Sequence, residues 1–335
     1  DPLWSRGLGD VYKRQALSSS LLIAIVLGLI AFPLFGSDFY TEILGKIFIL
    51  SIFALSLNLL VGVTGLVSLG HAAYFGIAAY AVTLLTPKTE ALSIWFALPM
   101  SILLSGIAAA IVGIFVLRTK GIYFIMVTLA FSQLAFYIFH DTDAGGGSDG
   151  IYLDNKPVVN LGDITLIDLS APGRIYYCLL ASLILIYAFL KIILKSPFGK
   201  VLLGIKSNEQ RMISMGYATF KYKLAAFTLA GAIAGFAGFW HAVLFGFVTP
   251  ELMSWHQSGN VLLMVILGGM GQLGGAIAGA IAFVGMQELF TDLTKHWQLL
   301  MGVVIVLAVL FMPGGIAAVP GRLGNLIYGR TQNDK

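Results

Sequence analysis

The sequence predicts an all-α fold, a polytopic transmembrane helix bundle of about ten spans. Hydrophobic residues make up 58% of the 335 positions and charged residues only 11%, less than half of the roughly 25% that is typical of soluble proteins. The mean hydropathy is +0.91. Apolar stretches of about 20 residues, the length that a helix needs to cross a bilayer, recur along the chain. This composition excludes a soluble enzyme and a disordered chain.

Ten stretches are long and apolar enough, or nearly so, to be membrane spans. They cover residues 17–36, 41–62, 65–85, 92–117, 121–140, 174–194, 222–248, 257–270, 273–290 and 297–312. The first is followed directly by further spans and lacks a small-residue cleavage site, so we interpret it as an anchor and not as a signal peptide. The eighth is short, which is typical of a broken or re-entrant segment.

Lys and Arg are distributed unevenly between the two sides of the predicted bundle. With the N-terminus in the cytoplasm, 15 of the 20 basic residues fall in inside regions. The five outside are Lys46, Lys88, Lys156, Arg174 and Lys295. Because cytoplasmic loops carry an excess of Lys and Arg, we predict this orientation, with both termini cytoplasmic. The net charge of +4 then reflects membrane orientation and gives no reason to expect nucleic acid as a partner.

We divide the chain into one membrane domain and two short ends. Residues 1–15 lack an apolar pattern and precede an abrupt hydrophobic start, so we interpret them as an extraneous or disordered segment. The membrane domain covers 16–316, and 317–335 form a cytoplasmic tail. Two hydrophilic loops interrupt the domain, an Asp- and Gly-rich external (periplasmic) loop at 141–173 and a basic cytoplasmic loop at 195–221.

A short helix is predicted within the cytoplasmic loop. The stretch from Lys206 to Met215 is compatible with a helix, Ser207 or Asn208 can cap its start, and Gly216 can end it. A cytoplasmic helix between two spans is where a membrane protein meets a cytosolic partner. The alternative is a plain solvated loop.

The residue patterns indicate no catalytic site and no metal site. The five histidines form no H-E-x-x-H, and neither G-x-S-x-G nor a Walker A sequence is present. Cys178 is the one cysteine, so we interpret it as a packing residue. We therefore expect no cofactor on this chain. If ATP drives the protein, another subunit must bind it.

Glycines at four-residue spacing indicate close helix packing. On a helix such residues share a face and let another backbone approach. The candidates are Gly231, Gly235, Gly271, Gly275 and Gly279. A G-x-G-x-x-G pattern begins at Gly269, but apolar stretches typical of membrane spans flank it, so helix packing is a better interpretation than nucleotide binding.

Neutral polar side chains are the main polar groups within the predicted spans. We take Asn58, Ser68, His71, Gln133 and Asn260 as candidates for lining a pathway. The alternative for each is hydrogen bonding between helices. Ionisable residues lie near predicted span ends, which disfavours a proton-coupled carrier, since such a carrier places carboxylates at mid-membrane depth.

Several stretches together resemble the permease subunits of branched-chain amino acid ABC importers, specifically the M-type of the two paired permeases. They are "LNLLVGVTGLVSLGHAAYFGIAAYA" at 57–81, "RTKGIYFIMVTLAFSQL" at 118–134, "GGSDGI" at 146–151, "SPFGKVLLGIKSNEQRMISMG" at 196–216, "LGGMGQLGGAIAGA" at 267–280 and "FMPGGI" at 311–316. The similarity runs from about residue 40 to 316, and its motifs occur in order.

The resemblance implies roles for residues of the basic loop. In that family this loop carries a coupling motif, a Glu followed by small residues and a Gly, and Glu209 and Gly216 occupy those positions. Gln210 and Arg211 depart from the motif's alanines. A capped helix here would seat in a cleft of an ATPase, with Lys206 and Arg211 adding electrostatic complementarity.

The resemblance also implies partners, a location and a substrate. The partners are a second homologous permease, two cytosolic ABC ATPases, a periplasmic or lipid-anchored substrate-binding protein and the lipid bilayer, with the chain in the bacterial inner membrane. The implied function is ATP-driven import of Leu, Ile and Val by alternating access. Two alternatives stay open: a permease for urea or short-chain amides in the same family, and a gradient-driven carrier or channel acting alone.

Overall fold

The computed structural model describes residues 27–33, 36–87, 91–161, 164–169, 172–312 and 314–318. The interpretation of 1–15, most of the span predicted at 17–36 and nearly all of the tail at 317–335 lie outside the described residues. Residues 27–33 are helical.

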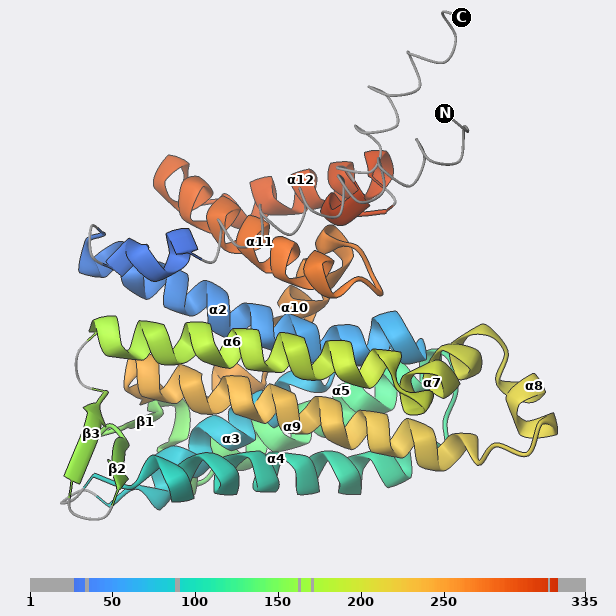
Figure 1. The fold of residues 1–335 in the computed structure, drawn as a ribbon, viewed down its shortest axis with the longest axis horizontal. Helices are drawn as coiled ribbons and strands as arrows, with labels where there is room; N and C mark the ends of the chain where they lie inside the picture. Colours follow the sequence, from blue (N-terminus) through green and yellow to red (C-terminus); the bar gives the residue numbers. More distant parts are fainter. Residues whose placement is uncertain are drawn as a thin grey trace, which may run out of the picture.

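The described part of the chain is a helix bundle with a few short strands (Figure 1). The helices are α2 Asp38–Asn58, continued by the π-helical turn η1 Leu59–Thr64, then α3 His71–Leu85, α4 Ile94–Val116, α5 Ile122–His140, α6 Pro172–Lys195, α7 Pro197–Ser207, α8 Glu209–Ser214, α9 Thr219–Phe245, α10 Trp255–Gly268, α11 Leu273–Leu293 and α12 Trp297–Phe311. The strands are β1 Ile151–Tyr152, β2 Val158–Leu161, β3 Ile164–Asp168 and β4 Phe247–Val248. Short 3-10 turns are η2 Asp143–Gly145, η3 Gly147–Asp149, η4 Pro250–Met253 and η5 Ile316–Ala318.

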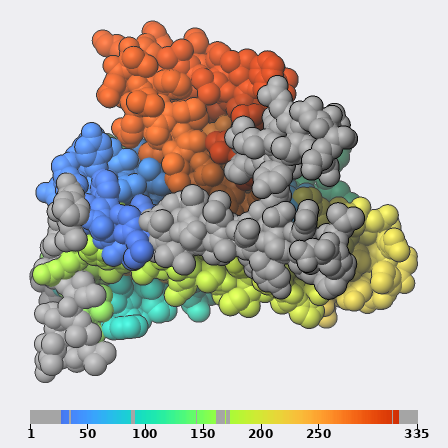
Figure 2. Space-filling view, turned by 45° about the horizontal axis from the view of Figure 1, so that its top comes forward, coloured from blue at the N-terminus to red at the C-terminus, as the bar shows by residue number. Residues whose placement is uncertain are grey.

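The long helices run side by side, with the strands at one end of the bundle and α7 and α8 at the other (Figure 1). We call these the strand end and the α8 end. α2, α3 and α9 form the centre: α9 packs against α2, α3 and α4, while α2 also packs against α6 and α11. Figure 2 shows α11 and α12 as a part that projects beyond α2 and α6.

Burial follows from the position of each helix in the bundle. α2 carries its charged residues in its first half and is apolar and buried in its second half, where Phe53 and Leu55 have no exposed surface. α4, α5 and α12 carry large apolar side chains on their outer faces, including Phe115, Leu134 and Leu310. Exposed apolar faces on helices whose backbone bonds are satisfied internally are what a lipid environment allows.

The expected number of ten spans is wrong for the described residues. Seven helices there are long and apolar enough to cross a membrane. α3 has 15 residues and α10 has 14, so at 1.5 Å per residue each is only about 21–23 Å long, against a hydrocarbon core of about 30 Å. The sequence at 65–85 and 257–270 is apolar, but a loop from Gly65 to Gly70 precedes α3, and α10 ends at Gly268, just before Gly269 with a φ of +114°.

The two short helices begin beside each other inside the bundle. The backbone N–H of Ala72, in the first turn of α3, donates to Ser258 Oγ of α10 at 2.9 Å. Ser132 of α5 donates to the carbonyl oxygen of Met253, which precedes α10, at 2.7 Å. We call this meeting point of two helix N-termini the broken-helix junction. It places polar side chains and backbone N–H groups between long apolar helices.

Glycines lie where helices touch backbone to backbone. A Cβ at Gly279 would overlap the carbonyl oxygen of Met264, and one at Gly275 would lie 2.8 Å from the carbonyl oxygen of Gly268. α10 and α11 therefore pack as a tight hairpin. Gly231 and Gly235 of α9 lie against the small side chains of Ala109 and Ser105 of α4, so these two helices also pack closely.

The loop at 141–173 is partly ordered into strands, which sequence patterns did not reveal. β1 pairs antiparallel with β4, with Ile151 opposite Val248, and β2 pairs antiparallel with β3. The β1–β4 pair ties this loop to the segment that follows α9. The strand end is thus a small folded cap on an otherwise helical bundle.

Candidate functional site

Two capped helices, α7 and α8, form the segment that was expected to hold one helix. Ser196 Oγ accepts from the N–H of Gly199 at the start of α7, and Asn208 Oδ1 accepts from the N–H of Arg211 at 3.0 Å at the start of α8. Of the two predicted caps, Asn208 is the one used. Lys206 belongs to α7, so the expectation of one continuous helix from Lys206 to Met215 is wrong: Asn208 takes an extended conformation and separates the two.

An ion pair holds α8 to the start of α9. Lys223 Nζ lies 2.6 Å from Glu209 Oε1, and the Thr219 hydroxyl donates to the same oxygen at 3.2 Å. The Lys223 side chain is 8% exposed and that of Glu209 26%. Burial alone would raise the pKa of the Glu209 carboxyl, but the hydrogen bond and charge of Lys223, with help from Thr219 and Lys120, outweigh it and hold this pKa below its usual range.

Lys206 ties α7 to the π-helical turn of α2. Its Nζ donates to the carbonyl oxygen of Gly62 at 2.6 Å. Wide π-helical turns leave carbonyl groups without the regular helical partner and occur often at functional sites. The Lys206 ammonium therefore reaches α2 although its side chain is partly exposed, whereas Arg211 is exposed on α8. Gly216 ends the segment with a φ of +86°, a conformation that favours glycine.

A cavity of about 300 Å³ opens beside these contacts. Its lining comes from η1 and the loop after it, from the α4–α5 loop and the start of α5, and from α7, α8 and α9. It carries four charged side chains. They are Lys120, Lys206, Glu209 and Lys223. Three ammonium groups and one carboxylate make this hollow electropositive.

The π-helical turn also touches the turn between α10 and α11. Asn58 Oδ1 accepts from the N–H of Gly271 at 2.8 Å, and Asn58 Nδ2 donates to the carbonyl oxygen of Gln272 at 3.2 Å. Gly62 lies directly against Gly271. The side-chain amide of Asn58 is thus used to clamp this turn, and a continuous series of contacts leads from α8 to α10.

The five predicted pathway residues do not converge on one space. Ser68 Oγ accepts from the N–H of Gly70. His71, near the broken-helix junction, stacks on Phe53, and its Nε2 lies 2.8 Å from Ser56 Oγ. His71 Nδ1 and Gln133 Nε2 are buried without a hydrogen-bond partner among the residues that the structure describes. Asn260 lines a different cavity.

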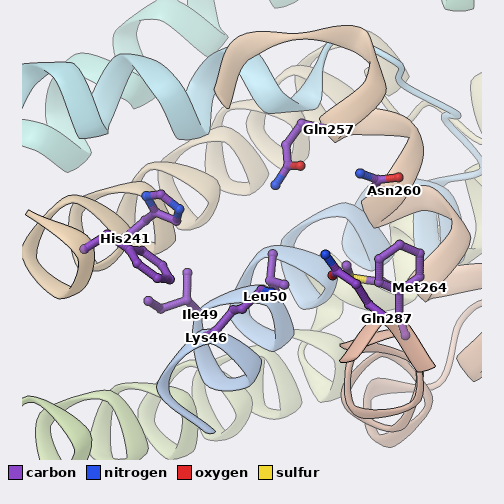
Figure 3. A pocket seen from close by; sticks show the side chains of 10 residues that line it. Lys46, Ile49, Leu50, His241, Gln257, Asn260, Met264 and Gln287 are labelled. Atoms are coloured by element: carbon purple, nitrogen blue, oxygen red, sulfur yellow. The ribbon is translucent and has the colours of Figure 1, made fainter. Parts of the chain in front are cut away.

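That second cavity, the α2–α11 cavity, has a volume of about 150 Å³ and lies between α2, α9, α10 and α11 (Figure 3). Its polar lining comprises Lys46, His241, Gln257, Asn260 and Gln287, and its apolar lining includes Ile49, Leu50 and Phe283. Of the polar five, only Asn260 was among the predicted pathway residues. Lys46 and Gln287 were missed because they lie near the ends of their spans. One signal was present in the sequence: Lys46 lies within one predicted span and Glu288 within another.

Known proteins resemble this chain along most of its length. Residues 39–309 match the family model described as "Branched-chain amino acid transport system / permease component". The high-affinity branched-chain amino acid transport system permease protein LivM of Salmonella typhimurium is 31% identical over 327 residues, which cover 92% of this chain and 76% of that protein. The protein of the same name from Escherichia coli is 31% identical, with 94% and 81% covered.

A more distant relative has another name. The L-arabinose ABC transporter permease protein AraH of Azospirillum brasilense is 23% identical, with 63% of this chain and 61% of that protein covered. No solved structure matches the chain. The family match runs from α2 into α12, and these relatives are all named as permease proteins. The chain is a multi-pass membrane transport subunit and belongs to the family of branched-chain amino acid transport system permease components.

Proposed function

We propose that this chain is the membrane permease subunit of an ATP-driven importer for the branched-chain amino acids Leu, Ile and Val. In this proposal it catalyses no covalent chemistry and binds no ATP. It converts ATP hydrolysis by partner subunits into alternating access for a substrate delivered on the other side of the membrane.

The observation that carries the proposal is the set of contacts that hold α8 and α7 against the bundle. α8 is short and exposed on most of its surface, yet the Glu209–Lys223 pair fixes it to α9 and Lys206 fixes the adjoining α7 to α2. A short helix that protrudes and is linked to two central helices suits the transmission of a push from a partner. A solvated loop would have no need of a nearly buried Lys223.

The orientation and partners follow from charge and family. We place the α8 end in the cytoplasm, where Lys and Arg are enriched, and the strand end outside, in the bacterial inner membrane. Two ABC ATPases would then contact α8, a substrate-binding protein would dock at the strand end, and a second homologous permease would complete the pathway.

The substrate class rests on the two relatives of about 31% identity, which are named for branched-chain amino acid transport. Urea and short-chain amides are the alternative within the same family. The test is uptake by the complete importer reconstituted in proteoliposomes. We expect ATP-dependent accumulation of radiolabelled leucine that requires the binding protein. Accumulation of urea and not leucine would overturn the substrate, and leucine accumulation without ATP would indicate a gradient-driven carrier.

A further inference from the structure

An ion pair lies at the edge of the α2–α11 cavity, toward the strand end of the bundle, and its side chains are 28% and 39% exposed. Lys46 lines the cavity, and its Nζ lies 3.2 Å from Oε1 of Glu288, the residue after the lining Gln287. Lys46 lies in the third turn of α2, and Glu288 lies five residues before the end of α11. Ionisable residues within a membrane span are costly, and they often mark the path of a substrate.

The rest of the cavity divides into a polar and an apolar part. Gln257 and Asn260 extend from α10 toward the space above α2 (Figure 3). Leu50 and Phe283 line the cavity with apolar surface. His241 Nδ1 is buried and has no hydrogen-bond partner among the described residues. Buried polar atoms in native proteins are rarely left in this state, so a ligand or water is expected beside it.

The size and charge of the cavity select a class of ligand. At about 30 Å³ per water molecule, about 150 Å³ holds a cluster of about five waters or one small solute of similar bulk. Lys46 lines the cavity and Glu288 lies beside it, just outside the lining. Together the two charges complement a zwitterion, whose carboxylate can meet Lys46 while its ammonium meets Glu288. Neutral urea gains nothing comparable from separated charges, and it has no apolar part to cover Leu50 and Phe283.

We propose that the α2–α11 cavity is a transient binding site for a zwitterionic aliphatic amino acid during its passage through the membrane. The proposal rests on the proposed function and deepens it by placing the substrate against named residues. Lys46 and Glu288 bind the two charged groups, Gln257 supplies a hydrogen bond, and the apolar wall receives the aliphatic side chain.

The test measures protection of an introduced cysteine in the complete importer held in nanodiscs without ATP. Cys178 is the one native cysteine, so Cys178→Ala gives a background free of thiols in this chain, with the partner subunits made cysteine-free as well. Asn260→Cys then reports on the cavity through its rate of reaction with a small thiol reagent. The matched control is Glu42→Cys, one turn before Lys46 on α2, which lines a separate cavity.

We expect saturating leucine to slow labelling of Asn260→Cys about fivefold or more, and urea at the same concentration to have no effect. Adding Lys46→Met should remove the protection, because a lost charge-assisted hydrogen bond weakens binding by about tenfold or more. Labelling of Glu42→Cys should stay unchanged by leucine. Equal labelling with and without leucine, protection that survives Lys46→Met, or equal protection of Glu42→Cys would overturn the inference.

The proposed function is measured separately, as ATP-driven leucine uptake by the Cys178→Ala importer. Leucine uptake without protection of Asn260→Cys would contradict the proposed binding site and would still support the proposed function. Loss of leucine uptake together with uptake of urea removes the proposed function, whatever the labelling shows.

Discussion

Reversing the charge of Glu209 tests whether the α8–α9 ion pair transmits force. Glu209→Lys places a second ammonium group beside Lys223, in a cavity that already holds Lys120 and Lys206. The wild-type pair is short, at 2.6 Å, and its lysine is 8% exposed. We therefore expect α8 to leave its position against α9.

The size of the effect follows from burial. An exposed ion pair contributes about 0–1 kcal/mol, and breaking a fully buried one costs about 3–5 kcal/mol. Because Glu209 is 26% exposed, the cost lies between these limits, at about 2–3 kcal/mol. That corresponds to about a 30- to 150-fold shift away from the docked position of α8.

The assay is leucine uptake and ATP hydrolysis by the complete importer in the same proteoliposomes. We expect Glu209→Lys to lower leucine uptake per ATP hydrolysed by about tenfold or more, while the protein stays in the membrane. The double variant Glu209→Lys with Lys223→Glu restores the pair with reversed polarity and should recover most of the coupling. Wild-type uptake per ATP in the single variant would refute the reasoning. No recovery in the double variant would show that Glu209 acts by direct contact with a partner.

Three further predictions concern other contacts of the bundle. Lys206→Met should reduce uptake per ATP, since it removes the hydrogen bond to Gly62, which contributes about 1.5–3 kcal/mol to holding α7 against α2. Lys200 is exposed on the same helix, so Lys200→Met should not change the ratio. Gly279→Ala should lower the free energy of unfolding in detergent by about 3 kcal/mol or more, because a Cβ there overlaps the α10 backbone. Gly285→Ala is the control, since a Cβ at Gly285 would meet open space. Coupling should also depend on pH: since the folded pKa of Glu209 lies below its ordinary value of 4.5, the pair contributes fully above that value and is lost as the pH falls through the folded pKa. Uptake per ATP that falls at pH 7 to 8 would contradict this assignment.

The fold class was predictable because it depends on composition and length alone. Twenty-residue apolar stretches leave a helix as the simplest way to satisfy the backbone in lipid, and seven of the described helices meet that criterion. The cap at Asn208 was predictable for a local reason, since a short polar side chain accepts from the N–H three residues on.

The two short helices and the ion pairs could not be predicted in the same way. α3 and α10 have the apolar composition of full spans, and only tertiary contacts such as Ala72 with Ser258 show where each begins. The partner of Glu209 is 14 residues away and that of Lys46 is 242 residues away. No periodicity in the sequence encodes such pairs, because they depend on how helices are arranged around one another.

The contacts from α8 inward restrict how the bundle can respond to a partner. A displacement of α7 must either break the bond from Lys206 to Gly62 or carry the π-helical turn of α2 with it. That turn cannot move alone, because Asn58 holds both Gly271 and Gln272 in the α10–α11 turn. α10 begins at the broken-helix junction against α3 and lines the α2–α11 cavity through Gln257 and Asn260. A continuous series of contacts therefore joins α8 to the cavity through two turns and one short helix.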